Sequence, residues 1–425
     1  MREVTQKVKP GCALNQLQCF FVHLCNGSLF QVSDFEEATG MFSQVLEPCE
    51  DRYIWPVGSP FASADVDLVL YFGSREQLAS GNRHTELQNE FPAAVVCGCS
   101  TGGQIVGDTI VDDVVVAMGF VFERTEIRLV AENLADPAAS RSCGEALGRT
   151  LAASDGLAGV FVLADGLNVN GNDLVTGLVA TLGEAIPITG GMACDGTVFG
   201  QTLVAGGAAP RPNVVAAIGF YGPAFRMGYG SGAGWQVFGP HRRVTRSSGN
   251  RVYDVDGAPI LDLYRRYLGD DEFAGLPRTG LLYPLQIHHP EAPDMKVIRA
   301  VLGVDHTDGS MYFGGDIPVG SIVQLMRGNF QRLAEGAGQA AAAARDCVDT
   351  GASAAILVSC IGRRILMGSR TEDEVVAVAE EFGTSVPCIG FYSLGEISPF
   401  PGTHCTGLHN QTMTVVAFSE RMDPA

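Results

Sequence analysis

The chain has 425 residues, with 28 Lys or Arg and 47 Asp or Glu, so its net charge at neutral pH is −19. This acidic balance excludes a general nucleic-acid-binding protein, which needs basic residues to displace the counterions of the phosphate backbone. It also argues against docking on anionic lipid. At about 150 residues per domain, the length predicts two or three domains.

Cysteine usage and hydropathy predict a cytoplasmic protein. The 12 cysteines contain no C-x-x-C pair, and their density is below that of disulfide-stapled proteins, which favours a reducing compartment. No stretch approaches 18 uninterrupted apolar residues, so the sequence predicts no membrane-spanning helix.

The first half of the chain divides into an irregular and a regular part. Residues 1–60 show little periodicity, and we expect them to form an N-terminal extension. After Asp65, valine-rich runs predict strands buried on both faces, at 66–72, 93–97, 114–121, 160–163 and 214–220. Pro137 opens a predicted helix that runs to about 153. Asn172 is expected to cap a second helix, which Gly183 ends.

The second half continues this mixture of strands and helices. Helices are expected at 259–268, at 329–347 and at 371–382, where Thr371 and Glu374 form a capping box. Strands are expected at 281–285, 297–304, 355–359, 388–392 and 413–419. The mixture predicts an α/β fold, with α+β as the alternative, in two layered domains with mixed sheets and flanking helices. The domain boundary, which is also a candidate hinge, is expected near 245–258.

A glycine-rich turn with a serine follows the strand at 93–97. Gly98-Cys99-Ser100-Thr101-Gly102 fits the G-x-S-x-G pattern of serine hydrolases, but that pattern requires a helix directly afterwards. The residues that follow, Gly103-Gln104-Ile105-Val106-Gly107, are a poor helix start. A tight turn at a strand end is one alternative. A loop whose backbone N–H groups contact a ligand is another.

Glycine alternates along residues 228–234. On a strand, this spacing places every glycine on one face. Such a face lets another backbone or a flat ligand approach closely, and we expect close packing.

Two further turns carry carboxylates. Residues 165–171, with Asp165 and Asn170, follow a predicted strand and precede a helix, which is a suitable place to orient a small ligand. Helix capping by Asn170 or Asn172 is the alternative. After Gly190-Gly191, Asp195 can bind an ammonium group or hold a turn.

The strand at 355–359 ends at Cys360, close to Arg363 and Arg364. Neighbouring cations can lower the pKa of a thiol, so Cys360 is a candidate reactive residue. The two arginines can also bind a carboxylate or phosphate, or form a surface salt bridge.

Histidines suggest two further kinds of site. His404, Cys405 and His409 are a candidate metal cluster, although zinc sites usually have three or four ligands with recognisable spacing. His241 follows Phe238-Gly239-Pro240 and has the best setting for a flat cofactor such as haem.

Many of these segments, in the same order, resemble the FIST sensory proteins of bacteria and archaea. The resemblance covers roughly 60–420, and its blocks are 98–101, 165–171, 189–195, 234–235, 238–240, 244–247, 256–264, 359–364, 390–397 and 408–413. The sequence departs from the family at Gly103-Gln104, where the family often has a glycine followed by glutamate. The resemblance assigns no catalytic residue to this sequence.

The resemblance implies an N-terminal FIST domain at 61–253 and a C-terminal FIST domain at 254–420. Together they would bind a small ligand, with amino acids or their derivatives as the suggested class. No output domain follows, so signalling would pass through a partner: a histidine kinase, a cyclic-di-GMP enzyme or a chemotaxis receptor. One branch of the family resembles nitric-oxide sensors that bind haem and regulate a histidine kinase.

We therefore predict a cytoplasmic sensory protein that binds a small ligand and is not an enzyme. Arg363 and Arg364 would hold a carboxylate, and Asp165 or Asp195 an ammonium group. Hydrogen bonds would come from the remaining candidate residues, which are Ser100, Thr101, Asn170 and Glu396. The alternatives are a haem-based sensor with His241 as ligand, and a hydrolase or thiol enzyme that uses Ser100 or Cys360.

Overall fold

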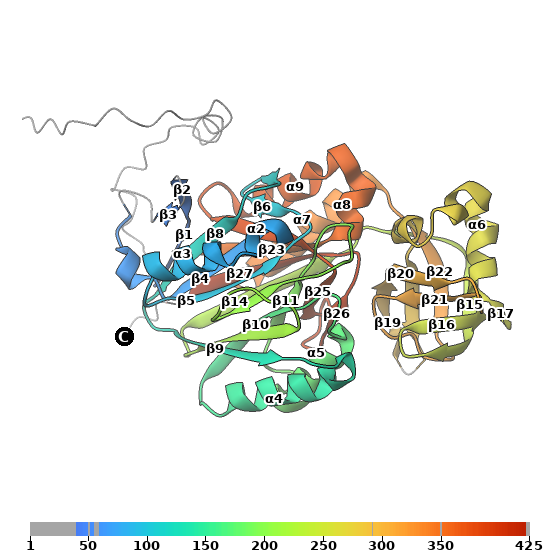
Figure 1. The fold of residues 1–425 in the computed structure, drawn as a ribbon, viewed down its shortest axis with the longest axis horizontal. Helices are drawn as coiled ribbons and strands as arrows, with labels where there is room; N and C mark the ends of the chain where they lie inside the picture. The colour runs from blue at the N-terminus through green and yellow to red at the C-terminus, as the bar shows by residue number, and fades with distance from the viewer. Residues whose placement is uncertain (1–39, 50–51, 55–58, 291, 349–350, 422–425) are drawn as a thin grey trace, which may run out of the picture. The chain divides into compact units, whose positions relative to one another are not determined.

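The computed structural model describes residues 40–49, 52–54, 59–290, 292–348 and 351–421. Most of these residues belong to three mixed sheets and one antiparallel sheet, with helices packed against them (Figure 1). A separate hairpin is formed by β2 (Glu47–Cys49) and β3 (Arg52–Ile54). The predicted α/β fold with mixed sheets and flanking helices is confirmed.

Three of the sheets share one arrangement, in which two parallel strands lie between antiparallel neighbours. The first sheet has the order β1 (Met41–Val45), β8 (Val116–Phe122), β4 (Leu68–Gly73), β5 (Val95–Ser100) and β12 (Val204–Gly206). The second has the order β26 (Thr406–His409), β25 (Gly395–Pro399), β11 (Ile188–Met192), β10 (Leu157–Ala164), β13 (Val214–Tyr221) and β9 (Glu126–Asn133). The third has the order β14 (Phe225–Gly232), β27 (Met413–Glu420), β23 (Ala354–Cys360), β24 (Cys388–Ser393), β6 (Gln104–Val106) and β7 (Thr109–Val111).

The parallel pairs define three similar units, because parallel neighbours need a crossover connection. In the first unit, α2 (Arg75–Leu78) and α3 (Asn82–Glu90) connect β4 to β5. In the second unit, α5 (Gly171–Leu182) connects β10 to β11. In the third unit, α8 (Ile361–Met367), the short 3-10 turn Gly368–Arg370 and α9 (Glu372–Phe382) connect β23 to β24.

The three units exchange strands in a cycle. The strand after β5 is β6, which pairs with β24. The strand after β24 is β25, which pairs with β11, and the strand after β11 is β12, which pairs with β5. Three backbone hydrogen bonds close the cycle where the chain bends, from Gly102 N to Tyr392 O (2.8 Å), from Cys194 N to Ser100 O (2.8 Å) and from Leu394 N to Met192 O (3.2 Å). The bends after β5, β11 and β24 therefore meet in one region, and two of them are glycine-rich turns that the sequence singled out, at 98–102 and 189–195.

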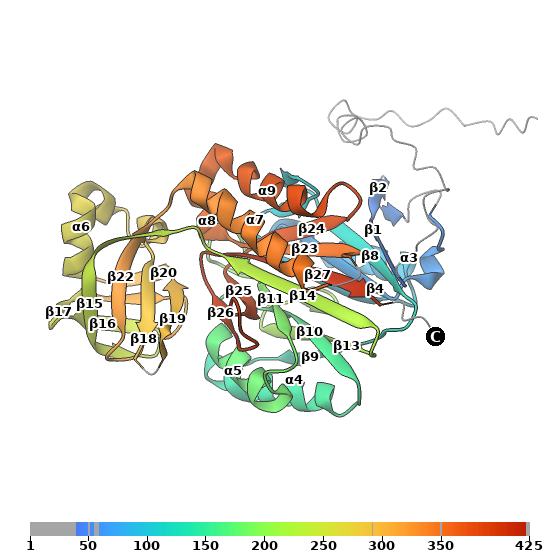
Figure 2. The ribbon, with the colours of Figure 1, turned by 180° about the vertical axis from the view of Figure 1, so that it is seen from behind.

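One large apolar core lies between the three sheets. It includes Phe72 from the first sheet, Phe161 from the second and Phe418 from the third, all fully buried. Helix α5 and α4 (Ser140–Ala152), which a 3-10 turn at Pro137–Ala139 precedes, cover the second sheet, while α7 (Phe330–Asp346) and α9 cover the third (Figure 2). The all-apolar strands of the sequence are buried on both faces for this reason.

The alternating glycines of β14 allow α7 to pack directly on the strand. A Cβ atom at Gly228, Gly230, Gly232 or Gly234 would lie no more than 2.1 Å from a carbonyl oxygen of α7. The four oxygens belong to Ala344, Ala340, Gly336 and Arg332, at a spacing of four residues along one face of the helix. The expectation of close packing is confirmed, and the partner is a helix backbone.

The fourth sheet forms a lobe at one side of the three units (Figure 1). Its strands are β19 (Ala292–Arg299), β18 (Leu285–His289), β22 (Ile322–Arg327), β15 (Gln236–Ser248), β16 (Arg251–Val255), β21 (Ser310–Phe313) and β20 (Val301–Asp305), with β17 (Ala258–Pro259) beside β16. Helix α6 (Ile260–Ala274) packs on it, with a non-helical kink at Gly269. The expected hinge at 245–258 lies within the β15–β16–β17 part of this sheet, and the hinge role stays a prediction.

Several local expectations need correction. Asn170, not Asn172, caps α5, since its side-chain oxygen accepts hydrogen bonds from the N–H groups of Asn172 and Asp173. Thr371 and Glu374 form no capping box, because Glu374 is buried and faces the core. The strand expected at 281–285 is a 3-10 turn at Arg278–Leu282, after which β18 starts at Leu285.

Two expectations concern the ends of the fold and the membrane. Within the expected extension at 1–60, residues 41–45 form β1, which pairs with β8 as part of the first sheet. Just after residue 60, Ser63–Asp65 form a 3-10 turn. Residues 1–39 lie outside the described residues. Among the helices that the structure describes, none is long and apolar enough to cross a membrane.

Candidate functional site

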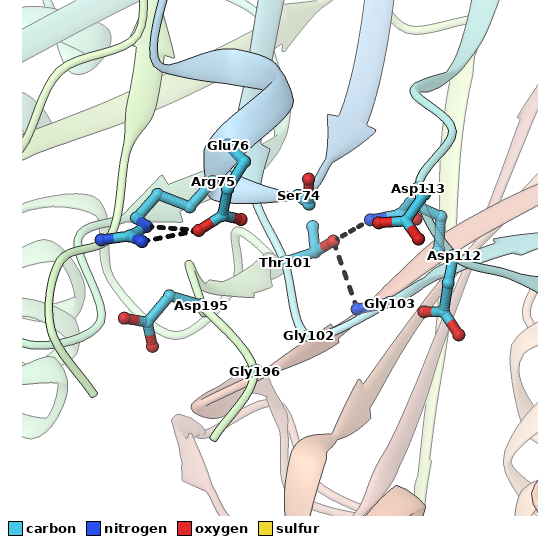
Figure 3. Close-up of a pocket in the computed structure, with 11 residues that line it drawn as sticks. Ser74, Arg75, Glu76, Thr101, Gly102, Gly103, Asp112, Asp113, Asp195 and Gly196 are labelled. Atoms are coloured by element: carbon cyan, nitrogen blue, oxygen red, sulfur yellow. Dashed lines mark hydrogen bonds and ion pairs between the residues drawn. The ribbon is translucent and has the colours of Figure 1, made fainter. Parts of the chain in front are cut away.

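A small pocket opens at the strand tips of the first unit. Its volume is about 170 Å³. It lies between the start of α2, the bend after β5, the loop before β8 and the bend after β11 from the second unit (Figure 3). The lining residues are Ser74, Arg75, Glu76, Thr101, Gly102, Gly103, Gln104, Asp112, Asp113, Asp195 and Gly196.

The floor of the pocket is a buried polar turn. Thr101 Oγ1 donates to Gly73 O (3.2 Å) and lies 2.6 Å from the side-chain amide of Gln104. Gly103 N donates to the same hydroxyl at 3.4 Å, as Figure 3 shows. At the start of α2, Ser74 accepts from Gln77 N, which holds the helix N-terminus at the pocket wall. Hydrogen bonds within the chain therefore hold the polar groups of this bend in place at the pocket floor.

Asp195 shapes the wall that comes from the second unit. Its carboxylate oxygens accept hydrogen bonds from the N–H groups of Phe199 (3.0 Å), Gly200 (2.7 Å) and Gln201 (3.0 Å). The side chain is buried, and it lines the pocket opposite Asp112 and Asp113 (Figure 3). It both holds its loop and contributes negative charge.

Arg364 of α8 approaches the pocket from the third unit. Its guanidinium pairs with both carboxylate oxygens of Asp112, at 2.9 and 2.6 Å, and donates to Gly102 O. It also lies over the ring of Tyr392, 5.3 Å from the ring centroid. Glu76 and Arg75 form a second pair on the other side, with Nη2 and Oε1 2.6 Å apart.

The charge around the pocket is predominantly acidic. Two of its four carboxylates, those of Glu76 and Asp112, are paired with arginines. Asp113 is exposed and has a left-handed backbone (φ 56°), with no hydrogen bond or ion pair to its side chain in the described part of the chain. A pocket with a free carboxylate and a nearby arginine suits a small ligand that carries both charges.

In the second unit, the predicted site residues already have hydrogen-bond partners within the chain. The Asp165 carboxylate accepts from the N–H groups of Leu167, Asn168 and Asn213 and from the Thr202 hydroxyl (2.7–2.9 Å). Asn170 caps α5. Asp165 and Asn170 follow a parallel strand of the second unit, in a region that corresponds to the pocket region of the first unit. Neither residue lines the pocket itself, and their ligand roles stay predictions.

Arg363 is likewise used within the fold of the third unit. Its side chain is fully buried and pairs with the buried Glu374 at 2.7 Å. It also donates to the carbonyl oxygens of Ala233 (2.5 Å) and Leu333 (2.9 Å). Of the two predicted arginines, Arg364 contacts two residues that line the pocket, Gly102 and Asp112, and Arg363 contacts none of them.

The two candidate nucleophiles are both buried. Ser100 Oγ accepts from Leu203 N (2.9 Å), and the chain continues into β6 instead of the helix that a hydrolase needs. Burial and Glu396 raise the pKa of Cys360 well above its usual value despite Arg363, so the expected lowering was wrong. A protonated, buried thiol is a poor nucleophile.

Glu396 lies on β25, away from the pocket. Its carboxylate is fully buried and accepts from Ser393 Oγ (2.7 Å), Thr412 N (3.1 Å) and Thr412 Oγ1 (2.8 Å). Burial raises the pKa of Glu396 to about 7 from 4.5, and these hydrogen bonds only partly oppose the shift. The group is therefore a source of pH-dependent stability.

We expect the stability that Glu396 provides to fall as pH rises. The folded protein holds a proton that the unfolded chain loses near pH 4.5, so this stabilisation is complete below 4.5 and lost through about pH 7. Relative to Glu396→Gln, the wild type should lose on the order of 3 kcal/mol between pH 4.5 and 8, measured by urea unfolding. The pKa of His409, lowered to about 4 by burial, acts in the opposite direction but is present in both proteins. Parallel pH profiles would contradict this assignment.

The surroundings of the histidines support neither the expected metal cluster nor the expected haem site. His409 is buried against Ser398 O (2.9 Å), whereas His404 is exposed beside Tyr229. Among the described residues, no group of three or more His, Cys, Asp or Glu side chains is placed to hold a metal. His241 is exposed on β15 next to exposed Gly239 and Pro240, which offer a porphyrin no apolar enclosure. The haem role of His241 stays a prediction without support from its surroundings.

Sequence reasoning missed part of the pocket. The Ser74-to-Gln77 cap directly after a strand was an available signal for the start of α2. Asp112 and Asp113 lie in the loop between β7 and β8 with no motif, and only the fold brings them to the bends at Thr101 and Asp195.

Comparisons with known proteins identify the family. Residues 67–258 match the FIST N domain and residues 261–399 match the FIST C domain. No curated protein matches the chain. Among solved structures, the chain is similar to a crystal structure of chorismatase at 9% sequence identity and a TM-score of 0.33, over 90% of this chain and 99% of that chain. The two domain matches span most of the chain, which therefore belongs to the FIST family of sensory, ligand-binding domains of signal transduction.

Proposed function

We propose that this protein senses an amino acid or a close derivative, which binds in the pocket between Thr101, Asp113 and Asp195. The observation that carries the proposal is the meeting of bends from two units, with Arg364 from the third, around one small polar recess. A volume of about 170 Å³ suits a ligand of this size better than a nucleotide.

The charges of the pocket match a zwitterion. The free carboxylate of Asp113 would attract an ammonium group, and buried Asp195 adds to the negative potential. A ligand carboxylate would interact with Arg364, either beside Asp112 or in its place, since a guanidinium binds a carboxylate through two parallel hydrogen bonds. Thr101 and the N–H groups of the glycine bend would fix its orientation.

Binding can be tested by calorimetry with the standard amino acids and their decarboxylated amines. For the amino acid that binds wild type, Arg364→Gln should raise Kd at least about 10-fold, since a charged hydrogen bond contributes about 1.5–3 kcal/mol. Asp113→Asn should weaken the same ligand by a smaller factor. The matched control is Arg370→Gln, an exposed arginine that pairs with Asp373, and it should leave Kd within about twofold.

Two results would reject the proposal. One is that no amino acid or amine binds wild type at millimolar concentration. The other is that Arg364→Gln and Arg370→Gln bind the ligand equally well.

We place the sensor in the cytoplasm, where it would act on a histidine kinase, a cyclic-di-GMP enzyme or a chemotaxis receptor. Eight of the cysteines that the structure describes are free thiols, which is consistent with a reducing compartment. Arg364 connects α8 to Asp112, in the loop that forms one wall of the pocket. A ligand that takes this arginine from Asp112 would therefore favour one arrangement of α8 relative to that loop over the other.

A further inference from the structure

One wall of the pocket has more negative than positive side chains. It comes from the start of α2 and the bend after β11, and its charged residues are Arg75, Glu76 and Asp195 (Figure 3). Arg75 pairs with Glu76 at 2.6 Å, and Asp195 also acts on it electrostatically. Two carboxylates therefore share one guanidinium, and this wall attracts a further cation.

The Asp195 carboxylate has the capacity for one more hydrogen-bond donor. It is 8% exposed and lines the pocket, and three backbone N–H groups donate to its two oxygens, at 2.7–3.0 Å. An ionised carboxylate has about four lone-pair sites, so one remains for a fourth donor. A charged donor of a ligand would use it best, because hydrogen bonds between oppositely charged groups are stronger than neutral ones.

The opposite wall has the same surplus of negative charge, together with a cation that a carboxylate can use. Arg364 pairs with Asp112, whereas Asp113 has no ion pair in the part of the chain that the structure describes. A Cβ atom at Gly103 would lie 1.9 Å from Arg364 Nη1, so this glycine lets the guanidinium lie directly against the bend that lines the pocket. An α-ammonium and an α-carboxylate can therefore both be bound at this wall.

A neutral zwitterion would leave the charge balance of the pocket unchanged. Around the pocket, two arginines face four carboxylates, which gives a formal charge of −2; the carboxylates are those of Glu76, Asp112, Asp113 and Asp195. A zwitterionic ligand adds one positive and one negative charge, so this surplus would remain. A ligand with a second positive charge would reduce it by one.

We propose that the ligand is a basic amino acid, such as lysine, ornithine or arginine, whose side-chain cation lies at the wall of Glu76 and Asp195. This inference rests on the proposed function, because it keeps the α-ammonium at Asp113 and the α-carboxylate at Arg364. Negative charge on both walls of one small recess favours a ligand with positive charge at both of its ends. Neutral and acidic amino acids do not supply that second charge.

Matched pairs of ligands test the second charge by calorimetry. Lysine should bind wild type at least about 10-fold more tightly than norleucine, which has the same carbon chain without the side-chain ammonium group. Arginine should likewise bind more tightly than citrulline, in which a neutral urea group replaces the guanidinium. Cadaverine, which is lysine without its carboxylate, should bind more weakly than lysine because it has no group for Arg364.

Two exposed glutamates, each paired with a nearby arginine, separate the pocket wall from the general charge of the protein. Glu76→Lys should weaken lysine binding at least about fivefold and norleucine binding by less than about twofold, because it reverses a charge only where the side-chain cation lies. The matched control is Glu126→Lys on β9, whose carboxylate pairs with Arg128 outside the pocket. This variant should leave both affinities within about twofold.

Three results would overturn this inference and leave the proposed function intact. The first is that lysine and norleucine bind wild type equally well. The second is that Glu76→Lys and Glu126→Lys weaken lysine binding to the same extent, which would mean a general attraction to an acidic protein. The third is tighter binding of cadaverine than of lysine. If no amino acid or amine binds at all, the proposed function itself is rejected.

Discussion

Replacing Arg363 with methionine is expected to lower the free energy of unfolding by about 3–5 kcal/mol, because it leaves a buried carboxylate without its cation. Glu374 and Arg363 are both fully buried, and they are 2.7 Å apart. The pair ties α9 to α8, and Ser359 and Tyr392 donate to the same carboxylate from β23 and β24. Urea unfolding followed by circular dichroism measures the loss.

A matched arginine and a double variant make this test specific. Arg370→Met removes an exposed pair with Asp373 and should change stability by less than about 1 kcal/mol. Adding Glu374→Gln to Arg363→Met should recover part of the loss, since the neutral amide no longer needs a cation. A loss below about 1 kcal/mol for Arg363→Met would show that the pair is not the centre of the third unit.

Gly230→Ala is expected to destabilise the protein by about 3 kcal/mol, which is large for the addition of one methyl group. The new Cβ would lie 2.0 Å from the carbonyl oxygen of Ala340, within the backbone of α7. No side chain can rotate away to relieve this overlap, so strand β14 and helix α7 must separate along their whole contact. Thermal and urea unfolding report the effect.

Another glycine of the same helix, on the side that faces α9, provides the control. Gly338 lies within α7, but a Cβ there would meet its nearest neighbour, Ala377 O, at 3.5 Å, an ordinary contact distance. Gly338→Ala should therefore stabilise the protein by about 0.5–1 kcal/mol through the higher helix propensity of alanine. If both alanine variants had the same effect, the close approach of β14 and α7 would not be what the glycines provide.

The repeated architecture explains why the predicted site residues were scattered. Asp165 and Arg363 come from corresponding positions after the first parallel strand of the second and third units, β10 and β23, whereas Thr101 follows the second parallel strand of the first unit, β5. In the second unit the position is filled by the Asp165 network, and in the third by the Arg363–Glu374 pair. The same kind of polar turn thus serves as a pocket wall in one unit and as internal support in two others.

The sequence alone determined the features that depend on local pattern. Valine-rich runs such as 160–163 predicted buried strands, the alternation of Gly228, Gly230 and Gly232 predicted a bare face, and the ordered motifs identified the family. These features follow from side-chain period and backbone freedom, which neighbouring residues set without knowledge of the fold.

Only the tertiary structure decided which polar residues face a recess. Arg363 and Arg364 are adjacent in the sequence, yet one pairs with Glu374 in the core and the other reaches Asp112 at the pocket. Asp112 and Asp195 are brought together by strand exchange between units, across more than 80 residues of chain. The physical reason is that a charged side chain needs a partner wherever it is buried, and the chain distant in sequence supplies either that partner or an open space.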